Sequence, residues 1–182
     1  MTPIHRSLPR RTSADTEGDV ARVLGKLEGT GQNLLVLQLV ANSPHAFRPF
    51  VLMANALLNN AELPRPVMEV AILWLAQHHE APYEWAEHEP MALRAGLSQE
   101  QIDALRTGDV GDPALFDDDD RLAVAMCEAL TVDKAVPPDL WERAVATWGE
   151  AGAMDVVFTV GWWGGLVLSF VRALGLTSPT EI

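Results

Sequence analysis

The sequence predicts an all-α protein, a single-domain helical bundle of roughly eight helices. Apolar residues recur at helical spacing in most segments, and Pro, Gly or capping residues separate these segments. An apolar run at 34–40 has the composition of a strand, but no partner strand is predicted elsewhere, so we expect a short helix there. A chain of 182 residues that is 48% hydrophobic is long enough to bury one core.

The predicted elements follow one another with recognisable boundaries. Residues 1–16 are rich in Pro, Ser, Thr and Arg, and we expect a flexible N-terminal arm followed by one helical domain over 17–182. Pro44 and Pro82 suit first helical turns, and Gly96 suits a left-handed helix end. The expected helices cover approximately residues 19–27, 34–40, 44–60, 64–78, 82–95, 98–108, 121–131, 140–148 and 151–174.

Charge and cysteine usage exclude several classes of function. With 13 basic and 25 acidic residues the formal net charge is −12, which repels nucleic acid and anionic membrane surfaces. Cys127 is the only cysteine, so an intramolecular disulfide, a Cys-x-x-Cys redox pair and a thiolate zinc cluster are impossible. The N-terminus lacks the apolar core of a secretory signal, and the apolar stretch 156–171 is shorter than the roughly 20 residues of a membrane span. We therefore expect a soluble cytoplasmic protein.

Acids and an imidazole gather in one part of the chain. Glu84 and His88 are four residues apart and share a helix face. The connection to the preceding predicted helix is short, so the two helices are antiparallel neighbours and Glu69 can face His88. An acid and an imidazole beside apolar surface suit proton transfer. A solvated surface pair explains the same spacing, and the residues alone leave both interpretations open.

These residues also belong to a longer pattern. It comprises Arg65-x-x-x-Glu69, Tyr83-Glu84-Trp85-x-x-His88 and Ala92-x-x-x-Gly96-Leu97-Ser98. The pattern resembles the carboxymuconolactone decarboxylase and alkylhydroperoxidase D superfamily over about 63–108, and more loosely up to Trp163. The resemblance implies an alkylhydroperoxidase D-like helical bundle for residues 17–182.

The resemblance also separates two branches of that superfamily. The peroxidase branch has a Cys-x-x-Cys pair whose second cysteine lies four residues before the histidine, and a glutamate on the previous helix completes a proton relay. Here the glutamate matches Glu69 and the histidine matches His88, but the cysteine positions hold Ala81 and Glu84. Attack on a peroxide needs a thiolate, so we expect no Cys-dependent peroxidase activity.

The decarboxylase branch lacks the cysteine pair and retains a histidine. It implies cofactor-free acid–base chemistry, such as a lyase or isomerase-like proton transfer on a small organic substrate, for example a lactone or keto-acid. In that interpretation His88 supplies the proton, Glu69 tunes it, Glu84 orients it or acts as a second acid, and Tyr83 donates to an oxyanion. The expected substrate-binding residues are Arg65, Trp85, Trp162 and Trp163. Few basic residues lie close by, which favours a weakly charged molecule.

Three further expectations remain. A non-catalytic ligand-binding or scaffold protein of the same fold is the alternative function. The superfamily builds trimers and hexamers through apolar helices, and residues 156–171 suit such a contact in a homo-oligomer. By residue type, metal ligands could come from His78, His79 and His88 with nearby glutamates. However, Pro82 interrupts the helical spacing between these histidines, so we expect no metal.

Overall fold

The computed structural model describes residues 8–30 and 35–178, and within these ranges every regular element is helical. The α-helices are α1 (Gly18–Leu27), α2 (Leu35–Val40), α3 (Pro44–Asn60), α4 (Arg65–His78), α5 (Pro82–Ala95), α6 (Gln99–Thr107), α7 (Asp118–Glu128), α8 (Pro138–Thr159) and α9 (Leu168–Leu174). A 3-10 turn η1 (Ser13–Asp15) and two π-helical segments, η2 (Ala129–Asp133) and η3 (Val160–Val167), complete them. If the contiguous α8, η3 and α9 count as one helix, these ranges contain eight, so the predicted all-α bundle is confirmed.

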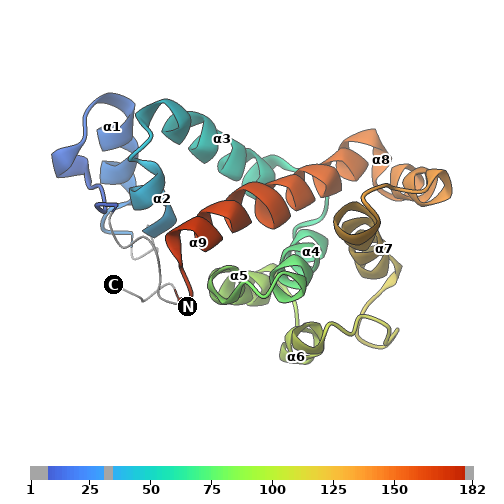
Figure 1. The fold of residues 1–182 in the computed structure, drawn as a ribbon. Helices are drawn as coiled ribbons and strands as arrows, with labels where there is room; N and C mark the ends of the chain where they lie inside the picture. The colour runs from blue at the N-terminus through green and yellow to red at the C-terminus, as the bar shows by residue number, and fades with distance from the viewer. Residues whose placement is uncertain (1–7, 31–34, 179–182) are drawn as a thin grey trace.

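Helix α4 is the centre of the fold. Every residue from Val67 to Ala76 is buried, because α5, α6, α7, α8 and η3 all pack against this helix. The long run from α8 to α9 crosses the molecule, with α1–α3 on one side and α4–α7 on the other (Figure 1). The buried apolar side chains of the described residues form one core cluster. This arrangement buries α4 almost completely and leaves part of α5 exposed.

Short-range chemistry explains most helix ends. Pro44 and Pro82 lie in first helical turns, and Gly96 ends α5 in the left-handed region at φ 112°. Ser98 and Gln101 form the expected capping box at the start of α6. Only His79–Ala81 separate α4 from α5, and Glu80 turns the chain with a positive φ of 51°. The short turn makes α4 and α5 neighbours, as predicted.

The C-terminal helical run departs from the prediction. Gly149 interrupts α8 at φ 72°, in agreement with the expected separation of 140–148 from 151–174. However, the predicted uniform helix 151–174 contains the π-helical segment η3 in its middle. Three glycines, Gly161, Gly164 and Gly165, weaken the local preference for α-helix and make the wider backbone accessible. Single π-helical turns are common at functional sites.

Part of the predicted N-terminal arm contacts the helices. The Ser13 backbone N–H and hydroxyl donate to Glu28 at 2.8 and 2.5 Å. The Arg11 backbone N–H donates to the Gln38 carbonyl at 3.1 Å. Residues 1–7 of the arm and Leu34 of the second predicted helix lie outside the described residues. The domain boundary at residue 16 stays a prediction.

One helical run in the described ranges is long and apolar enough to cross a membrane by length and composition, namely Pro138–Leu174. The predicted limit at 156–171 was thus too short, because the helical run extends on both sides of that stretch. A single such helix argues only weakly for a membrane, since core helices of water-soluble proteins meet the same criteria.

Candidate functional site

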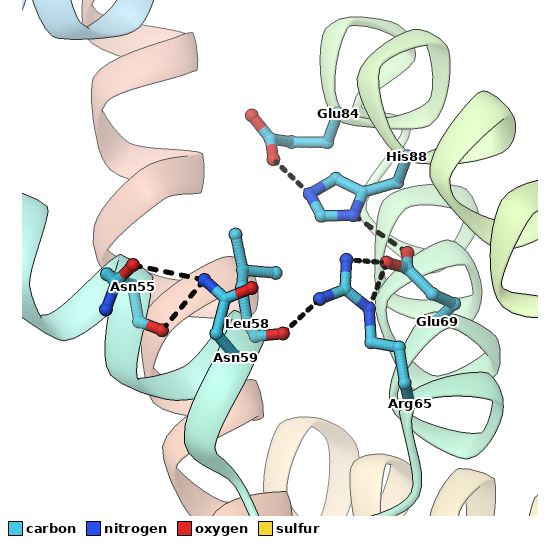
Figure 2. Close-up of polar contacts among 7 residues, drawn as sticks. All are labelled: Asn55, Leu58, Asn59, Arg65, Glu69, Glu84 and His88. Atoms are coloured by element: carbon cyan, nitrogen blue, oxygen red, sulfur yellow. Dashed lines mark hydrogen bonds and ion pairs between the residues drawn. The ribbon is translucent and has the colours of Figure 1, made fainter. Parts of the chain in front are cut away.

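The centre of the candidate site is a buried acid–imidazole pair. His88 Nδ1 lies 2.9 Å from Oε2 of Glu69 (Figure 2), and the two residues are 5% and 0% exposed. Glu69 comes from α4 and His88 from the middle of α5. The pairing of Glu69 with His88 predicted from the antiparallel helices is therefore confirmed. The alternative that Glu84 and His88 form a solvated surface pair is wrong, because both are buried.

Arg65 holds the other oxygen of Glu69. Its Nε and Nη2 donate to Glu69 Oε1 at 2.8 and 2.5 Å, and its Nη1 donates to the backbone carbonyl of Leu58 at 2.5 Å. The guanidinium thus joins the end of α3 to α4 (Figure 2). Both oxygens of Glu69 thus face nitrogen donors, the Arg65 guanidinium at Oε1 and the His88 ring at Oε2. We therefore assign the hydrogen bond at Oε2 with Nδ1 as donor, and in this tautomer of the neutral ring Nε2 is the acceptor.

Glu84 lies on the other side of the imidazole. Its Oε2 is 3.9 Å from His88 Nε2, which is too far for a direct hydrogen bond. Burial raises the pKa of Glu84 to about 7, with His88 acting in the opposite direction and Glu87 adding to the increase. Glu84 therefore exchanges its proton near neutral pH, where an ordinary glutamate is fully ionised.

The two tryptophans of η3 have different surroundings. The Trp163 ring meets His88 edge to face, with ring centroids 5.5 Å apart and an interplanar angle of 88°. The Trp162 ring instead packs on Phe50 of α3 at 4.6 Å, and Phe50 also meets Phe170 of α9. The structure brings Trp163 to the site and places Trp162 in the packing between helices.

The segment of the chain that contains this site matches a known protein family. Residues 44–114 match the model of the Carboxymuconolactone decarboxylase family. The predicted resemblance is confirmed. The family segment contains Arg65, Glu69, Glu84 and His88, whereas η3 with Trp163 lies outside it. No curated protein and no solved structure matches the chain.

Two other predicted residues of the family segment, Trp85 and Tyr83, are buried in α5. The Trp85 indole donates from Nε1 to Glu89 at 3.0 Å, and the Arg106 guanidinium of α6 lies 4.5 Å from its ring centroid. Trp85 thus contacts Glu89 of its own helix and Arg106 of α6. Tyr83 is buried in the first turn of α5, and its role as an oxyanion donor stays a prediction.

Arg65 has partners that its predicted role did not include. It was expected to bind substrate, but its guanidinium is bound to Glu69 and to Leu58. The sequence contained no signal for the Leu58 contact, because the acceptor is a backbone carbonyl. We interpret Arg65 as a residue that positions Glu69.

The Cys127 thiol and the histidines at the end of α4, His78 and His79, have other surroundings. Cys127 is fully buried, and burial raises its pKa to about 12, so its thiol stays protonated. His78 stacks on Trp74 at 4.9 Å, and its ring meets His79 edge to face. In residues 8–30 and 35–178, no three His, Cys, Asp or Glu side chains are arranged to hold a metal ion.

Proposed function

We propose that this protein is a cofactor-independent enzyme that moves a proton on a small organic molecule, in a lyase-type or isomerase-type reaction. The observation that carries the proposal is the buried bond from His88 Nδ1 to Glu69, which leaves Nε2 beside Glu84. A histidine held in one tautomer by a carboxylate is a ready general base. Membership of the matched segment in the Carboxymuconolactone decarboxylase family supports a decarboxylase-like or related activity.

In this mechanism His88 acts as the general base and Glu84 as the general acid. His88 Nε2 takes a proton from a carbon next to a carbonyl group and later returns it. Glu84, protonated for part of the time near pH 7, donates to the carbonyl oxygen as negative charge develops there. The two groups are 3.9 Å apart, so one substrate molecule can place its acidic carbon at Nε2 and its neighbouring carbonyl oxygen at Glu84. The edge contact with Trp163 supplies an apolar wall beside the imidazole.

The charges near the site favour a substrate without a charge at its reacting end. The guanidinium of Arg65 is bound to Glu69 and to the Leu58 carbonyl. The titratable neighbours that shift the pKa of Glu84 are His88, which lowers it, and Glu87, which raises it. A carboxylate placed against Glu84 would meet like charge whenever Glu84 is ionised. A lactone or ketone without a neighbouring carboxylate suits this site better than a carboxylated lactone.

Replacing His88 with glutamine is expected to abolish this chemistry and leave the fold intact. The assay needs no known product: protein in deuterated buffer is mixed with neutral lactones and ketones such as γ-butyrolactone and cyclohexanone. NMR then follows exchange of the protons next to the carbonyl. Loss of the general base should slow enzyme-dependent exchange by about 10²–10⁴-fold.

Two outcomes would contradict the enzyme proposal. One is accelerated exchange that His88→Gln retains in full while circular dichroism shows a native fold. The other is no acceleration of any compound by the wild-type protein. The second outcome would favour the non-catalytic ligand-binding or scaffold alternative.

We also propose that the protein assembles with copies of itself, as a trimer or hexamer. Met154 and Phe158 lie four residues apart on α8 and are 41% and 46% exposed, and Leu166 of η3 is 43% exposed. Large apolar side chains grouped along one helical run favour contact with another apolar surface. The same surface would serve the scaffold alternative.

Replacing Phe158 with glutamate is expected to dissociate the assembly. The buried charge would have no partner in an apolar contact. Light scattering after size exclusion should give a multiple of 19.9 kDa for wild type and a smaller mass for the variant. Val132→Glu is the matched control, because Val132 is 50% exposed on η2. A monomeric wild type, or dissociation by the control alone, would contradict the proposal.

A further inference from the structure

The π-helical segment η3 packs on the end of α4, and Gly164 lies in this contact. A Cβ added to Gly164 would lie 3.1 Å from Leu75 Cδ2 and 3.4 Å from His79 Nε2. The Leu75 distance is tighter than nine in ten real Cβ contacts, so an alanine there must push one neighbour away. The next residue towards the N-terminus is Trp163, whose ring meets His88.

The contact with His79 depends on shape and not on hydrogen bonding. His79 Nε2 is buried and has no hydrogen-bond partner among the described residues. Burial lowers the pKa of His79, and the charges of His78 and Arg172 lower it further, so the ring stays neutral at neutral pH. Arg172 of α9 donates to the His79 backbone carbonyl at 2.9 Å and holds this turn in place. The neutral ring acts here as a rigid packing surface.

The other two glycines of η3, Gly161 and Gly165, are not needed for such a close contact. A Cβ at Gly161 would meet nothing within 4 Å, and one at Gly165 would meet only the Val160 carbonyl, at 4.0 Å. Within the described part of the chain, the close approach of η3 to α4 therefore requires glycine at 164 and not at the other two glycines of η3. This difference within one helical segment identifies Gly164 as the point of contact.

We propose that Gly164 is a positioning residue: its missing side chain lets η3 sit directly on Leu75 and His79, and this contact sets how the Trp163 ring meets His88. A displacement of η3 at residue 164 is carried to residue 163, because the two share one helical backbone. The inference rests on the proposed function, in which His88 carries the proton. It adds a residue that touches neither the proton nor the substrate.

The test measures the surroundings of His88 directly. The ring protons of His88, assigned by their loss in His88→Gln, are followed by NMR in full-length protein with labelled histidine. The Trp163 indole shifts these resonances through its ring current, so Trp163→Leu gives the reference for complete loss of the contact. Gly164→Ala should move the His88 resonances part of the way towards that reference. Gly161→Ala, in the same segment with open space, should leave them at the wild-type positions.

A rescue variant separates positioning from general damage. Leu75→Val removes the methyl group that a Cβ at 164 would meet, so Gly164→Ala/Leu75→Val should return the resonances towards wild type. The double variant also serves as the test if Gly164→Ala alone does not fold, and resonances away from wild type in it would then overturn the proposal. Unchanged resonances in folded Gly164→Ala, or equal changes in Gly161→Ala, would also overturn it. The readout needs no turnover, so failure here is distinguishable from failure of the proposed function.

Discussion

Replacing Glu69 with glutamine is expected to lower the free energy of unfolding by about 3 kcal/mol. Glu69 is completely buried and accepts hydrogen bonds from Arg65 at one oxygen and from His88 at the other. Glutamine keeps the shape, but it removes the charge opposite Arg65 and turns an amide NH₂ towards a donor. Breaking one partner of a buried ion pair is costly, because the remaining charge stays in a poorly solvated place.

Urea unfolding at pH 7 measures this loss. The matched control is Glu89→Gln, whose carboxylate pairs with Arg106 at 2.6 Å near the surface, with side chains 26% and 48% exposed. Ion pairs in such positions contribute at most about 1 kcal/mol, so the control should lose far less stability. Equal losses in the two variants would show that Glu69 does not support the fold through its buried pair with Arg65.

Replacing Glu84 with glutamine is expected to stabilise the protein at alkaline pH and to change little at pH 5. The folded-state pKa of Glu84 is about 7, above its ordinary value of 4.5, because of burial. Between these values the folded state binds more protons than the unfolded state, so stability falls as pH rises through this window. Above about pH 7 the cost of the buried charge is complete, on the order of 3 kcal/mol. Glutamine, which does not ionise, avoids that cost.

Urea midpoints at pH 5 and pH 9 test the sign and the size of this effect. The difference between Glu84→Gln and wild type should be small at pH 5 and should grow by pH 9. Glu62→Gln, at an exposed position, should show no such growth. A Glu84→Gln curve that runs parallel to wild type over the whole range would refute the raised pKa. It would also remove the acid that the proposed mechanism places beside His88.

Much of the fold was predictable because its signals are local. Pro44, Pro82 and Gly96 act through their own backbone angles, and each ends or begins a helix where the sequence predicts. The pair between Glu69 and His88 was predictable from helical spacing and a short turn alone. These features need only the geometry of one helix or of two consecutive helices.

Other features depended on contacts between distant segments. The carbonyl of Leu58 that accepts from Arg65 carries no residue signature, so sequence reasoning assigned Arg65 to the substrate. Trp162 and Trp163 are adjacent and identical in type, yet one faces Phe50 and the other His88. Adjacent residues on any helix point in different directions, so the packing of η3 against its neighbours decides which tryptophan faces His88. Local propensity predicts only that glycine weakens the helix there.

By itself, the sequence determined the helical class, the order of the helices, the absence of a redox thiol pair and the facing of Glu69 and His88. Only the tertiary structure decided that Glu84 is buried, that Arg65 is bound to Glu69 and that Trp163 closes on His88. The reason is that residue type and spacing specify which face of a helix a side chain occupies. Desolvation and aromatic contact depend on which other helices cover that face, and these helices come from far along the chain.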